Sequence, residues 1–366
     1  METKNRGLYL HVPFCKRKCT YCDFYSGSYC ERNARTYLDA VLRELDANAD
    51  SYPNSIIDTI YIGGGTPSVL PYDILEKIIN RVFSNFRTDI KEFTIEVNPS
   101  SCDNLRLYKD LGINRVSMGV QSLNDNILTR IGRLHNANMA LEALETANKY
   151  IDNVSADVML GLPMQTTLDA VATVEGIIPY VKHVSAYMLK INEETPIYND
   201  FKLSECDFPD DDATVDIYNA IYDVLEKNGF HRYEISNFSK DGYESKHNLK
   251  YWNREEYFGI GPSASGFLNG NRIDNVSDLN DYVNCVKSDV TSISTEDAMF
   301  ETIMLSLRLP SGLDIQKFNS EFNTNFLKKY KEILNNLKDI LVVDGNTVYI
   351  KEDKLLLESL VAREFL

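Results

Sequence analysis

Residues 9–22 read YLHVPFCKRKCTYC, a short apolar run followed by cysteines at positions 15, 19 and 22. The apolar run predicts a strand, so Cys15, Cys19 and Cys22 share the loop that follows it. Three thiolates on one loop can close around a single metal centre. A structural zinc site or a closed iron–sulfur cluster uses four protein ligands. Three cysteines therefore predict a metal centre with one position open to an exogenous ligand.

Two plainer interpretations of the cysteines are a zinc site that lacks its fourth ligand and a set of free thiols. The nearest residues that would complete a zinc site are Cys30 and His11, and neither stands at a familiar zinc spacing. The pattern CxxxCxxC after the first strand of an α/β chain favours the open metal centre.

Composition is typical of a soluble protein with a large core and an appendage: 366 residues, 43% hydrophobic and 25% charged. No apolar run approaches the ~20 residues of a membrane span, and the first residues lack the apolar core of a signal peptide. Seven cysteines, an odd number, fit a reducing compartment. We therefore expect a cytoplasmic protein. The net charge of −16 argues against a nucleic-acid partner.

Short strands alternate with helical segments through the first half of the chain. After the first strand we expect further strands at 56–62, 92–97, 114–120, 154–160 and 183–189, with a helix around 37–45. This alternation predicts about six strand–helix units with parallel connections, an α/β fold. In barrels of this kind the chemistry lies at the carboxyl ends of the strands. The cysteine loop, the glycines at 63–65, Glu96, Gln121 and Asp157 all fall at or near such ends.

The second half of the chain changes character. A helix capped by the acidic residues 210–212 ends at Asn228-Gly229 and precedes a strand at 230–235. Helices are then expected at 300–309, 314–322 and 326–341, followed by a hairpin at 342–350 with an Asp-Gly turn. We accordingly expect a barrel domain over 1–236, a linker region over 237–296 and a small helical, winged-helix-like domain over 297–366.

The cysteine stretch resembles the radical S-adenosylmethionine (SAM) superfamily. The form YLHVPFCxxxCxYC is similar to the oxygen-independent coproporphyrinogen III oxidase (HemN) family and its heme chaperone branch, HemW. The resemblance implies an incomplete (β/α) barrel, with a [4Fe–4S] cluster on Cys15, Cys19 and Cys22 whose fourth iron binds SAM. It also implies that an electron from the cluster can cleave SAM to methionine and a 5′-deoxyadenosyl radical.

The same resemblance implies which residues contact SAM. Taken alone, the glycine cluster predicts only a tight turn, and Glu96 predicts an ion pair or a place on the barrel rim. A sulfonium cation and ribose hydroxyls nevertheless need carboxylate and amide acceptors, and the carboxylate of SAM can use an arginine. The implied set is Tyr9, Tyr21, Gly64, Gly65, Thr66, Glu96, Gln121, Arg133 and Asp157.

Two departures separate the branches of the family. The decarboxylating oxidases carry a further cysteine where this chain has Phe24, and they have an amino-terminal extension where this chain has only residues 1–6 before its first strand. Both departures favour the chaperone branch. We assign no catalytic residue.

The stretch 247–252 reads HNLKYW and contains the single tryptophan. Its histidine could belong to a core cluster or a helix-end cap, but an imidazole beside flat aromatic faces also suits heme. HNxxYW is a hallmark of the chaperone branch, which implies that His247, Asn248, Tyr251 and Trp252 bind heme. Relatives often have GxGAH in the next segment, where this chain has Ser265 in place of the histidine.

The resulting hypothesis is a heme chaperone that delivers heme to respiratory proteins and carries a [4Fe–4S] cluster and SAM. One alternative is a radical SAM enzyme, either a coproporphyrinogen decarboxylase or a HemN-like methyltransferase. Another is a SAM-binding protein without turnover. The expected partners are heme, recipient hemoproteins and an electron donor. A homodimer and a transient visit to the membrane are left open.

Overall fold

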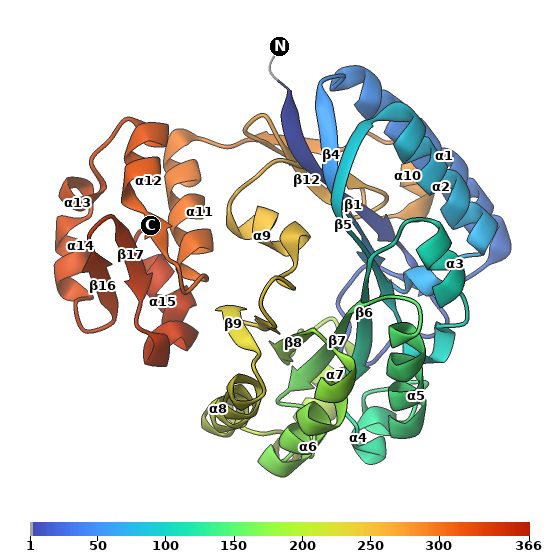
Figure 1. Cartoon of the computed structure of the whole chain (residues 1–366), viewed down its shortest axis with the longest axis horizontal. Helices are drawn as coiled ribbons and strands as arrows, with labels where there is room; N and C mark the ends of the chain where they lie inside the picture. Colours follow the sequence, from blue (N-terminus) through green and yellow to red (C-terminus); the bar gives the residue numbers. More distant parts are fainter. Residues whose placement is uncertain (1–2) are drawn as a thin grey trace.

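The computed structural model describes residues 3–366, in which a curved sheet is covered on its outer side by helices (Figure 1). Within these residues the large sheet has 12 strands in the order β14-β13-β12-β11-β1-β4-β5-β6-β7-β8-β10-β9. The run from β11 to β8 is parallel throughout. The predicted α/β architecture with parallel strand–helix units is confirmed.

The six predicted parallel strands are all present. Along β5, β6 and β7, apolar residues of the main core alternate with polar residues, so each of these strands has one apolar face and one largely polar face. In β4, Ile57, Ile60 and Ile62 are buried. The bounds are β1 Lys4–Val12, β4 Ser55–Gly64, β5 Arg87–Val97, β6 Arg115–Gln121, β7 Asn153–Leu160 and β8 His183–Met188.

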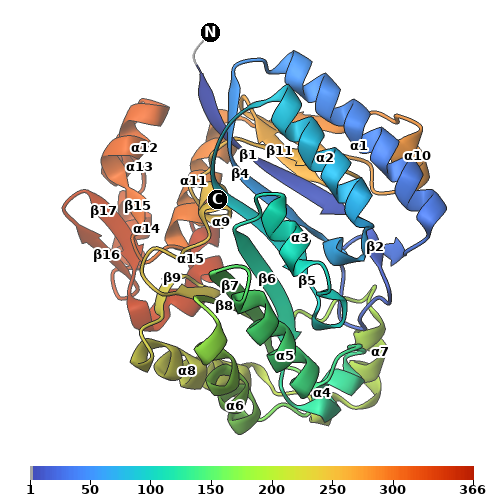
Figure 2. The same ribbon diagram turned by 45° about the vertical axis from the view of Figure 1, so that its right-hand side comes forward.

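The outer layer is formed by helices that return the chain from one parallel strand to the next (Figure 2). In α1, the buried residues Tyr37, Leu38, Val41 and Leu45 recur at helical spacing, as predicted. The predicted helix after Asp210 is also present, and Gly229 follows it with a φ of 75°. The bounds are α1 Glu31–Ser51, α2 Tyr72–Asn85, α3 Leu105–Asp110, α4 Asp125–Arg130, α5 Ala137–Asn148, α6 Thr167–Ile177, α7 Pro196–Leu203 and α8 Asp211–Lys227.

Short strands extend both edges of the parallel sheet. The stretch 237–296, expected to be a linker region, supplies most of them, and it also carries two short helices. The domain boundaries at 236 and 296 stay a proposal. The bounds are β9 His231–Glu234, β10 Asn237–Ser239, α9 Lys246–Trp252, β11 Tyr257–Ile260, β12 Ser265–Leu268, β13 Asn271–Asp274, α10 Leu279–Val283 and β14 Asp289–Ser292; β2 Phe14–Cys15 and β3 Gly27–Ser28 pair separately.

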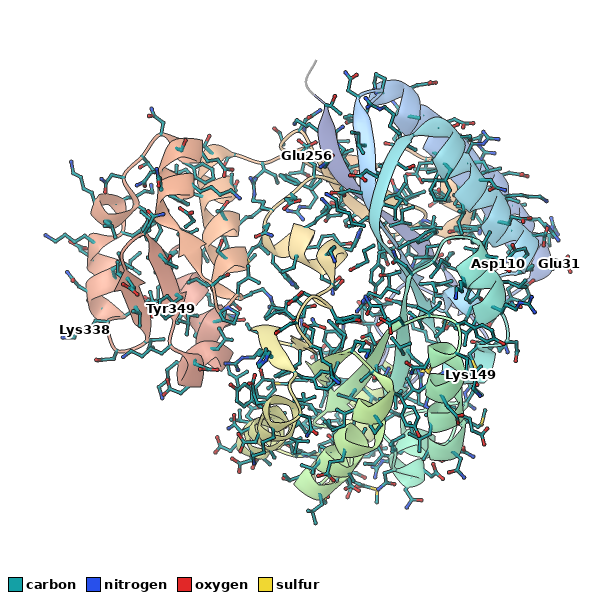
Figure 3. The ribbon with its side chains drawn as sticks, viewed as in Figure 1. Glu31, Asp110, Lys149, Glu256, Lys338 and Tyr349 are labelled. Atoms are coloured by element: carbon teal, nitrogen blue, oxygen red, sulfur yellow. The ribbon has the colours of Figure 1, made fainter. Side chains whose placement is uncertain are left out.

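The C-terminal unit has its own apolar core and a small sheet in the order β15-β17-β16. Lys338 and Tyr349, labelled in Figure 3, lie on this unit. The predicted hairpin is confirmed, with Gly345 at a φ of 55° in its turn. The bounds are α11 Thr295–Leu307, β15 Leu313–Asp314, α12 Ile315–Phe322, α13 Phe326–Lys329, α14 Lys331–Asn336, β16 Leu341–Asp344, β17 Thr347–Ile350 and α15 Glu358–Arg363.

The single helix predicted over 326–341 is wrong. The helix is interrupted at Tyr330, and the chain enters a strand at Leu341. Tyr330 packs its ring 5.0 Å from that of Phe326 and 5.3 Å from that of Phe365, measured between ring centroids. This packing against a C-terminal residue explains the break, because burial of the Tyr330 ring in tertiary contacts outweighs the intrinsic helix propensity of the segment. Across residues 3–366, no helix combines the length and the apolar character needed to cross a membrane.

Candidate functional site

The cysteine loop leaves the carboxyl end of β1 and is held by backbone contacts on two sides. Arg17 donates to the carbonyl oxygens of Gly132 at 2.7 Å and Arg133 at 2.8 Å. The Thr20 N–H donates to the Ile131 carbonyl, and the Thr20 carbonyl accepts from the Ile197 N–H. The loop is therefore fixed between the α4–α5 turn and the start of α7.

Two of the three cysteine sulfurs accept hydrogen bonds from side chains. The Thr66 hydroxyl lies 3.5 Å from the Cys15 sulfur, and an Arg133 guanidinium nitrogen lies 3.4 Å from the Cys19 sulfur. Desolvation by burial raises the pKa of Cys22 to about 11, so that thiolate requires nearby positive charge. A hydrogen bond donated to a thiolate stabilises its negative charge, and a positively charged iron–sulfur core does the same. The residues present therefore fit an iron–sulfur cluster.

The described residues do not gather three cysteine, histidine or carboxylate side chains closely enough for a single metal ion. In a cubane cluster each thiolate binds a different iron, so the geometry for one ion is not required. The cluster assignment rests on three thiols in one fixed loop and on the hydrogen bonds to two of their sulfurs.

The glycine segment after β4 packs directly on the cysteine loop. A Cβ atom at Gly64 would lie 2.7 Å from the His11 ring, and one at Gly65 would lie 2.6 Å from the Phe14 carbonyl oxygen. Gly64 also has a φ of 109°, which side-chain-bearing residues rarely adopt. The Thr66 N–H donates to the Phe14 carbonyl at 2.8 Å, which brings the Thr66 hydroxyl to Cys15. The glycines thus place Thr66 at the cluster loop.

Two carboxyl groups lie on β5 and β7: Glu96 is one residue before the end of β5, and Asp157 is in the middle of β7 rather than near its end as expected. Glu96 accepts from the Tyr61 hydroxyl at 2.9 Å and from the Gly64 N–H at 3.1 Å. Burial and the negative charge of Asp157 raise the pKa of Glu96 to about 7. Asp157 accepts from the Ser117 hydroxyl at 3.1 Å, and burial raises its pKa as well. A cation bound between these carboxyl groups would relieve their mutual repulsion.

Arg133 connects the cysteine loop to the end of β6. Its guanidinium donates to the Asn98 side-chain oxygen and the Gly119 carbonyl, besides Cys19 and the Tyr21 hydroxyl. Its Nε is buried and has no hydrogen-bond partner in the described part of the chain. Gln121, which ends β6, has a φ of 67°, and its side-chain nitrogen borders Gly119 together with Arg133. These polar groups form one edge of the site.

Tyr9 completes the other edge. Its hydroxyl lies 3.0 Å from His11 Nδ1, and its ring centroid lies 6.2 Å from that of Tyr61. On this edge, Tyr61 contacts both Tyr9 and Glu96, and Glu96 also accepts from Gly64. On the other edge, Arg133 contacts Tyr21 of the cysteine loop and lies beside Gln121. Tyr61, Asn98 and Ser117 also belong to this site, although the sequence pattern did not indicate them. Tyr61 lies on the same strand as Gly63 with a spacing of two residues, a signal that could have found it.

The histidine of HNLKYW lies inside the protein. His247 is 0% exposed; its Nδ1 lies 2.9 Å from the Thr59 hydroxyl and its Nε2 lies 2.8 Å from the Tyr251 hydroxyl. Burial, with a smaller effect of the Lys250 charge, lowers the pKa of His247 to about 3. The imidazole is therefore neutral, and both of its nitrogens are in use. This is the core-cluster arrangement, in which a ring nitrogen could bind a heme iron only after its own hydrogen bond, to Tyr251 or to Thr59, had broken.

The rest of the motif holds α9 between the sheet and the C-terminal unit (Figure 1). Trp252 faces this unit, with the Arg308 guanidinium 4.3 Å from its ring centroid. The Tyr251 ring lies 4.6 Å from that of Tyr257. Asn248 is in the first turn, where its N–H donates to the hydroxyl of Ser245 at 3.4 Å. The hydroxyl of the exposed Ser265 donates a hydrogen bond to the Asp274 carboxylate on the neighbouring strand.

Sequence analysis also missed Glu92, a buried carboxylate on β5. It accepts from the N–H groups of Lys246 at 2.7 Å and His247 at 3.2 Å, and from the Ser245 hydroxyl at 3.2 Å. Glu92 therefore caps the start of α9 from the sheet.

Comparisons with known proteins cover both the parallel sheet and the C-terminal unit. A model of the radical SAM superfamily matches residues 9–176, and a model of the HemN C-terminal domain matches residues 293–342. The heme chaperone HemW of Lactococcus lactis is 32% identical over 100% of this chain and 98% of its own length, and that of Bacillus subtilis is 32% identical over 99% of each chain. The solved structure of coproporphyrinogen III oxidase (HemN) from Escherichia coli, a radical SAM enzyme, has a TM-score of 0.88 at 21% identity, covering 100% of this chain and 90% of that one.

Proposed function

The chain belongs to the HemW family of heme chaperones and has a radical SAM core, and from this premise we propose that it binds heme and delivers it to recipient hemoproteins. The observation that carries the proposal is the length of the match, which includes both the cysteine loop and the C-terminal unit. Phe24 agrees with it. This side chain is 63% exposed beside the loop and offers no ligand atom where the oxidases have a further cysteine.

We further propose that Cys15, Cys19 and Cys22 hold a [4Fe–4S] cluster and that SAM binds beside it. The cluster and SAM together would supply reductive cleavage to a carbon radical. The chain's own residues orient the two groups: Thr66 and Arg133 donate to the cysteine sulfurs. Glu96 and Asp157 offer acceptors to the cationic part of SAM. The other residues proposed to border SAM are Tyr9, Tyr21, Gly64, Gly65 and Gln121.

A second candidate is a radical SAM enzyme acting on coproporphyrinogen III. The observation in its favour is the likeness of the whole chain to the fold of the HemN enzyme. At 21% identity this likeness shows the fold alone. The absence of a cysteine at position 24 favours the chaperone.

Titration of the reconstituted protein with hemin tests the proposal. We expect a Soret band that saturates at a fixed heme-to-protein ratio and heme transfer to an apo-hemoprotein added afterwards. Failure to bind heme would overturn the proposal. The competing enzyme predicts CO₂ release from coproporphyrinogen III with SAM and a reductant under anaerobic conditions.

The cluster has a separate test. Cys19→Ala should lose bound iron and sulfide, because Cys19 lies in the CxxxCxxC loop. Cys30→Ala, which changes an exposed cysteine outside that pattern, should retain both. Equal iron and sulfide contents in the two variants would overturn the ligand assignment without bearing on heme.

The remaining partners stay proposals. A reducing electron donor is required if the cluster is to transfer an electron, and the basic run of Lys16, Arg17 and Lys18 beside the cluster loop suits an acidic protein. A homodimer and transient contact with a membrane are also proposals. That His247, Asn248, Tyr251 and Trp252 bind heme is also a proposal; the His247 ring is buried, and a ring nitrogen would have to give up its hydrogen bond to bind iron.

A further inference from the structure

The C-terminal unit is joined to the large sheet by a single stretch of backbone. The exposed strand β14 ends at Ser292, and α11 begins at Thr295 with Ser294 as its N-cap. The unit also has an apolar core that is separate from the core of the large sheet. A unit with its own core and one covalent link moves as a body unless its contact with the neighbouring unit is large and apolar. The nature of this contact therefore decides whether the unit can move.

Few apolar side chains hold the contact together. Among the described residues, Leu356 is the side chain of the C-terminal unit that packs against the core of the large sheet, and Ile235 packs against the C-terminal core from the other side. A cavity of about 1020 Å³ takes up part of the space between the two, and the unit lines it with Arg308, Leu356 and Glu358. Apolar burial therefore contributes little to this contact.

The charges around the cavity oppose a tight contact. Its lining has four carboxylates against two cations: Glu205, Asp210, Asp211 and Glu358 against Lys190 and Arg308. Glu358 is 3% exposed, its Oε1 has no hydrogen-bond partner in residues 3–366, and burial raises the pKa of its carboxyl group. A buried oxygen without a partner costs free energy, and like charges repel. This part of the contact therefore disfavours closure.

Ion pairs hold the unit in place instead. Glu301 on α11 accepts from Arg254 at 2.9 Å and from Arg272 at 2.8 Å, and both arginines belong to the sheet region. The Glu301 and Arg254 side chains are 17% and 13% exposed, so their attraction is stronger than that of a pair on the open surface. Arg308 of the unit also pairs with Glu234 at 2.9 Å. We call Glu301 with its two arginines the latch.

The latch lies next to α9, the helix of HNLKYW. Arg254 follows Trp252 by two residues, and the Arg308 guanidinium of the C-terminal unit lies 4.3 Å from the centroid of the Trp252 ring. The indole N–H of Trp252 is buried and has no hydrogen-bond partner within residues 3–366. The C-terminal unit thus covers the end of α9, which lies between this unit and the sheet (Figure 1).

We propose that the C-terminal unit is a hinged cover over α9, held closed by the latch and opened by rotation about residues 292–295. Opening moves Arg308 away from the Trp252 ring and gives solvent access to the covered end of α9. The bearing of the cover on heme rests on the proposed function, because α9 carries the four residues proposed to bind heme. The cover would then set the rate at which heme reaches this helix.

Trp252 is the single tryptophan of the chain, so its fluorescence reports the opening without a label. The full-length, cluster-reconstituted proteins are compared at equal cluster content, with acrylamide as the quencher. Glu301→Gln removes the charge that two arginines share, and the ratio of open to closed molecules should rise by about tenfold or more. Stronger quenching and a red-shifted emission should follow. Glu296→Gln is the matched control on the same helix, because Glu296 pairs with Lys329 inside the unit, and it should behave as wild type.

Arg272→Gln breaks the latch from the opposite side. Arg272 is on β13, far from Trp252 in the sequence, so stronger quenching in this variant reports movement of the whole unit. Added salt should shift the wild-type protein in the same direction by screening the latch. Wild-type quenching in both Glu301→Gln and Arg272→Gln would overturn the cover. If circular dichroism shows that Glu301→Gln does not fold, Arg272→Gln decides alone.

The association rate of hemin is the second readout, followed by the Soret band after rapid mixing. It should be higher in Glu301→Gln than in wild type and in Glu296→Gln, because the cover is open more often. Stronger quenching with an unchanged association rate would overturn the control of heme access. A wild-type protein that binds no heme would overturn the proposed function, and the fluorescence measurements would still decide whether the unit is a cover.

Discussion

The Thr59 hydroxyl and His247 Nδ1 lie 2.9 Å apart at the contact between β4 and α9. The other ring nitrogen of His247 is held by Tyr251, and the side chain is wholly buried. A neutral imidazole in this place links a strand of the barrel to the helix that meets the C-terminal unit. The most recognisable histidine of the chain therefore fixes the position of α9, whose Trp252 ring lies 4.3 Å from the Arg308 guanidinium.

The stability of the protein should fall at acidic pH in part because of His247. Its pKa is about 3 in the folded state and about 6.5 in the unfolded state. Below pH 6.5 the unfolded chain therefore binds a proton at this histidine that the folded chain does not bind, which favours unfolding. Between pH 6.5 and 5 this one group should remove about 2 kcal/mol from the free energy of unfolding. His247→Gln should show a correspondingly smaller loss in urea unfolding at pH 7 and pH 5. His183 and His135, whose pKa values are also lowered, are unchanged in both proteins. An identical pH dependence in the variant would contradict the prediction.

Removal of the Glu92 carboxylate should destabilise α9. Glu92→Ala leaves the Lys246 and His247 N–H groups and the Ser245 hydroxyl without their acceptor, in a region closed to water. We expect a loss of about 3 kcal/mol or more in the free energy of unfolding, measured with urea. Glu92→Gln keeps one acceptor oxygen of the same shape and should lose less. Equal unfolding midpoints for wild type and Glu92→Ala would show that the cap is not needed.

The parallel strands could be predicted because each carries several apolar residues within a short stretch that ends in a turn or polar signal. The edge strands β12, β13 and β14 could not, since each has four residues and β14 is exposed along its whole length. Such strands depend on pairing with a neighbour that only the fold provides. The break at Tyr330 was missed for the same reason, because its cause is packing against the distant Phe365.

The sequence predicted that Cys15, Cys19 and Cys22 share one loop after the first strand, and the structure places them there; their binding of a cluster stays a prediction. His247 shows the limit of such motifs. The pattern predicted neither the burial of its ring nor its hydrogen bond to Thr59, because Thr59 lies on a strand far away in the sequence.

The contact between the glycine segment and the cysteine loop should be sensitive to one methyl group. Gly64→Ala adds a Cβ atom 2.7 Å from the His11 ring, at a φ of 109°. Gly229→Ala is the matched control, because Gly229 has a φ of 75° but nothing lies within 4 Å of its added Cβ. The control should lose about 1 kcal/mol of stability from backbone strain alone. Gly64→Ala should lose more and should also hold less iron and sulfide after reconstitution. Equal losses of stability with full iron content in both variants would argue against this contact.

Binding of SAM should tighten as the pH rises through neutrality. The pKa of Glu96 is about 7, because burial and Asp157 disfavour its charge, so the carboxyl is mostly protonated at pH 6 and mostly ionised at pH 8. A sulfonium cation favours the ionised form. The affinity of the cluster-loaded protein for SAM, measured by equilibrium dialysis, should therefore rise by up to about tenfold between these two values. Glu96→Gln, which cannot ionise, should bind SAM more weakly at pH 8 and with a flat pH profile. Glu175→Gln, at an exposed position on α6, should keep the wild-type profile. Persistence of the same rise in Glu96→Gln would assign the effect to a different group and remove Glu96 from the proposed SAM site.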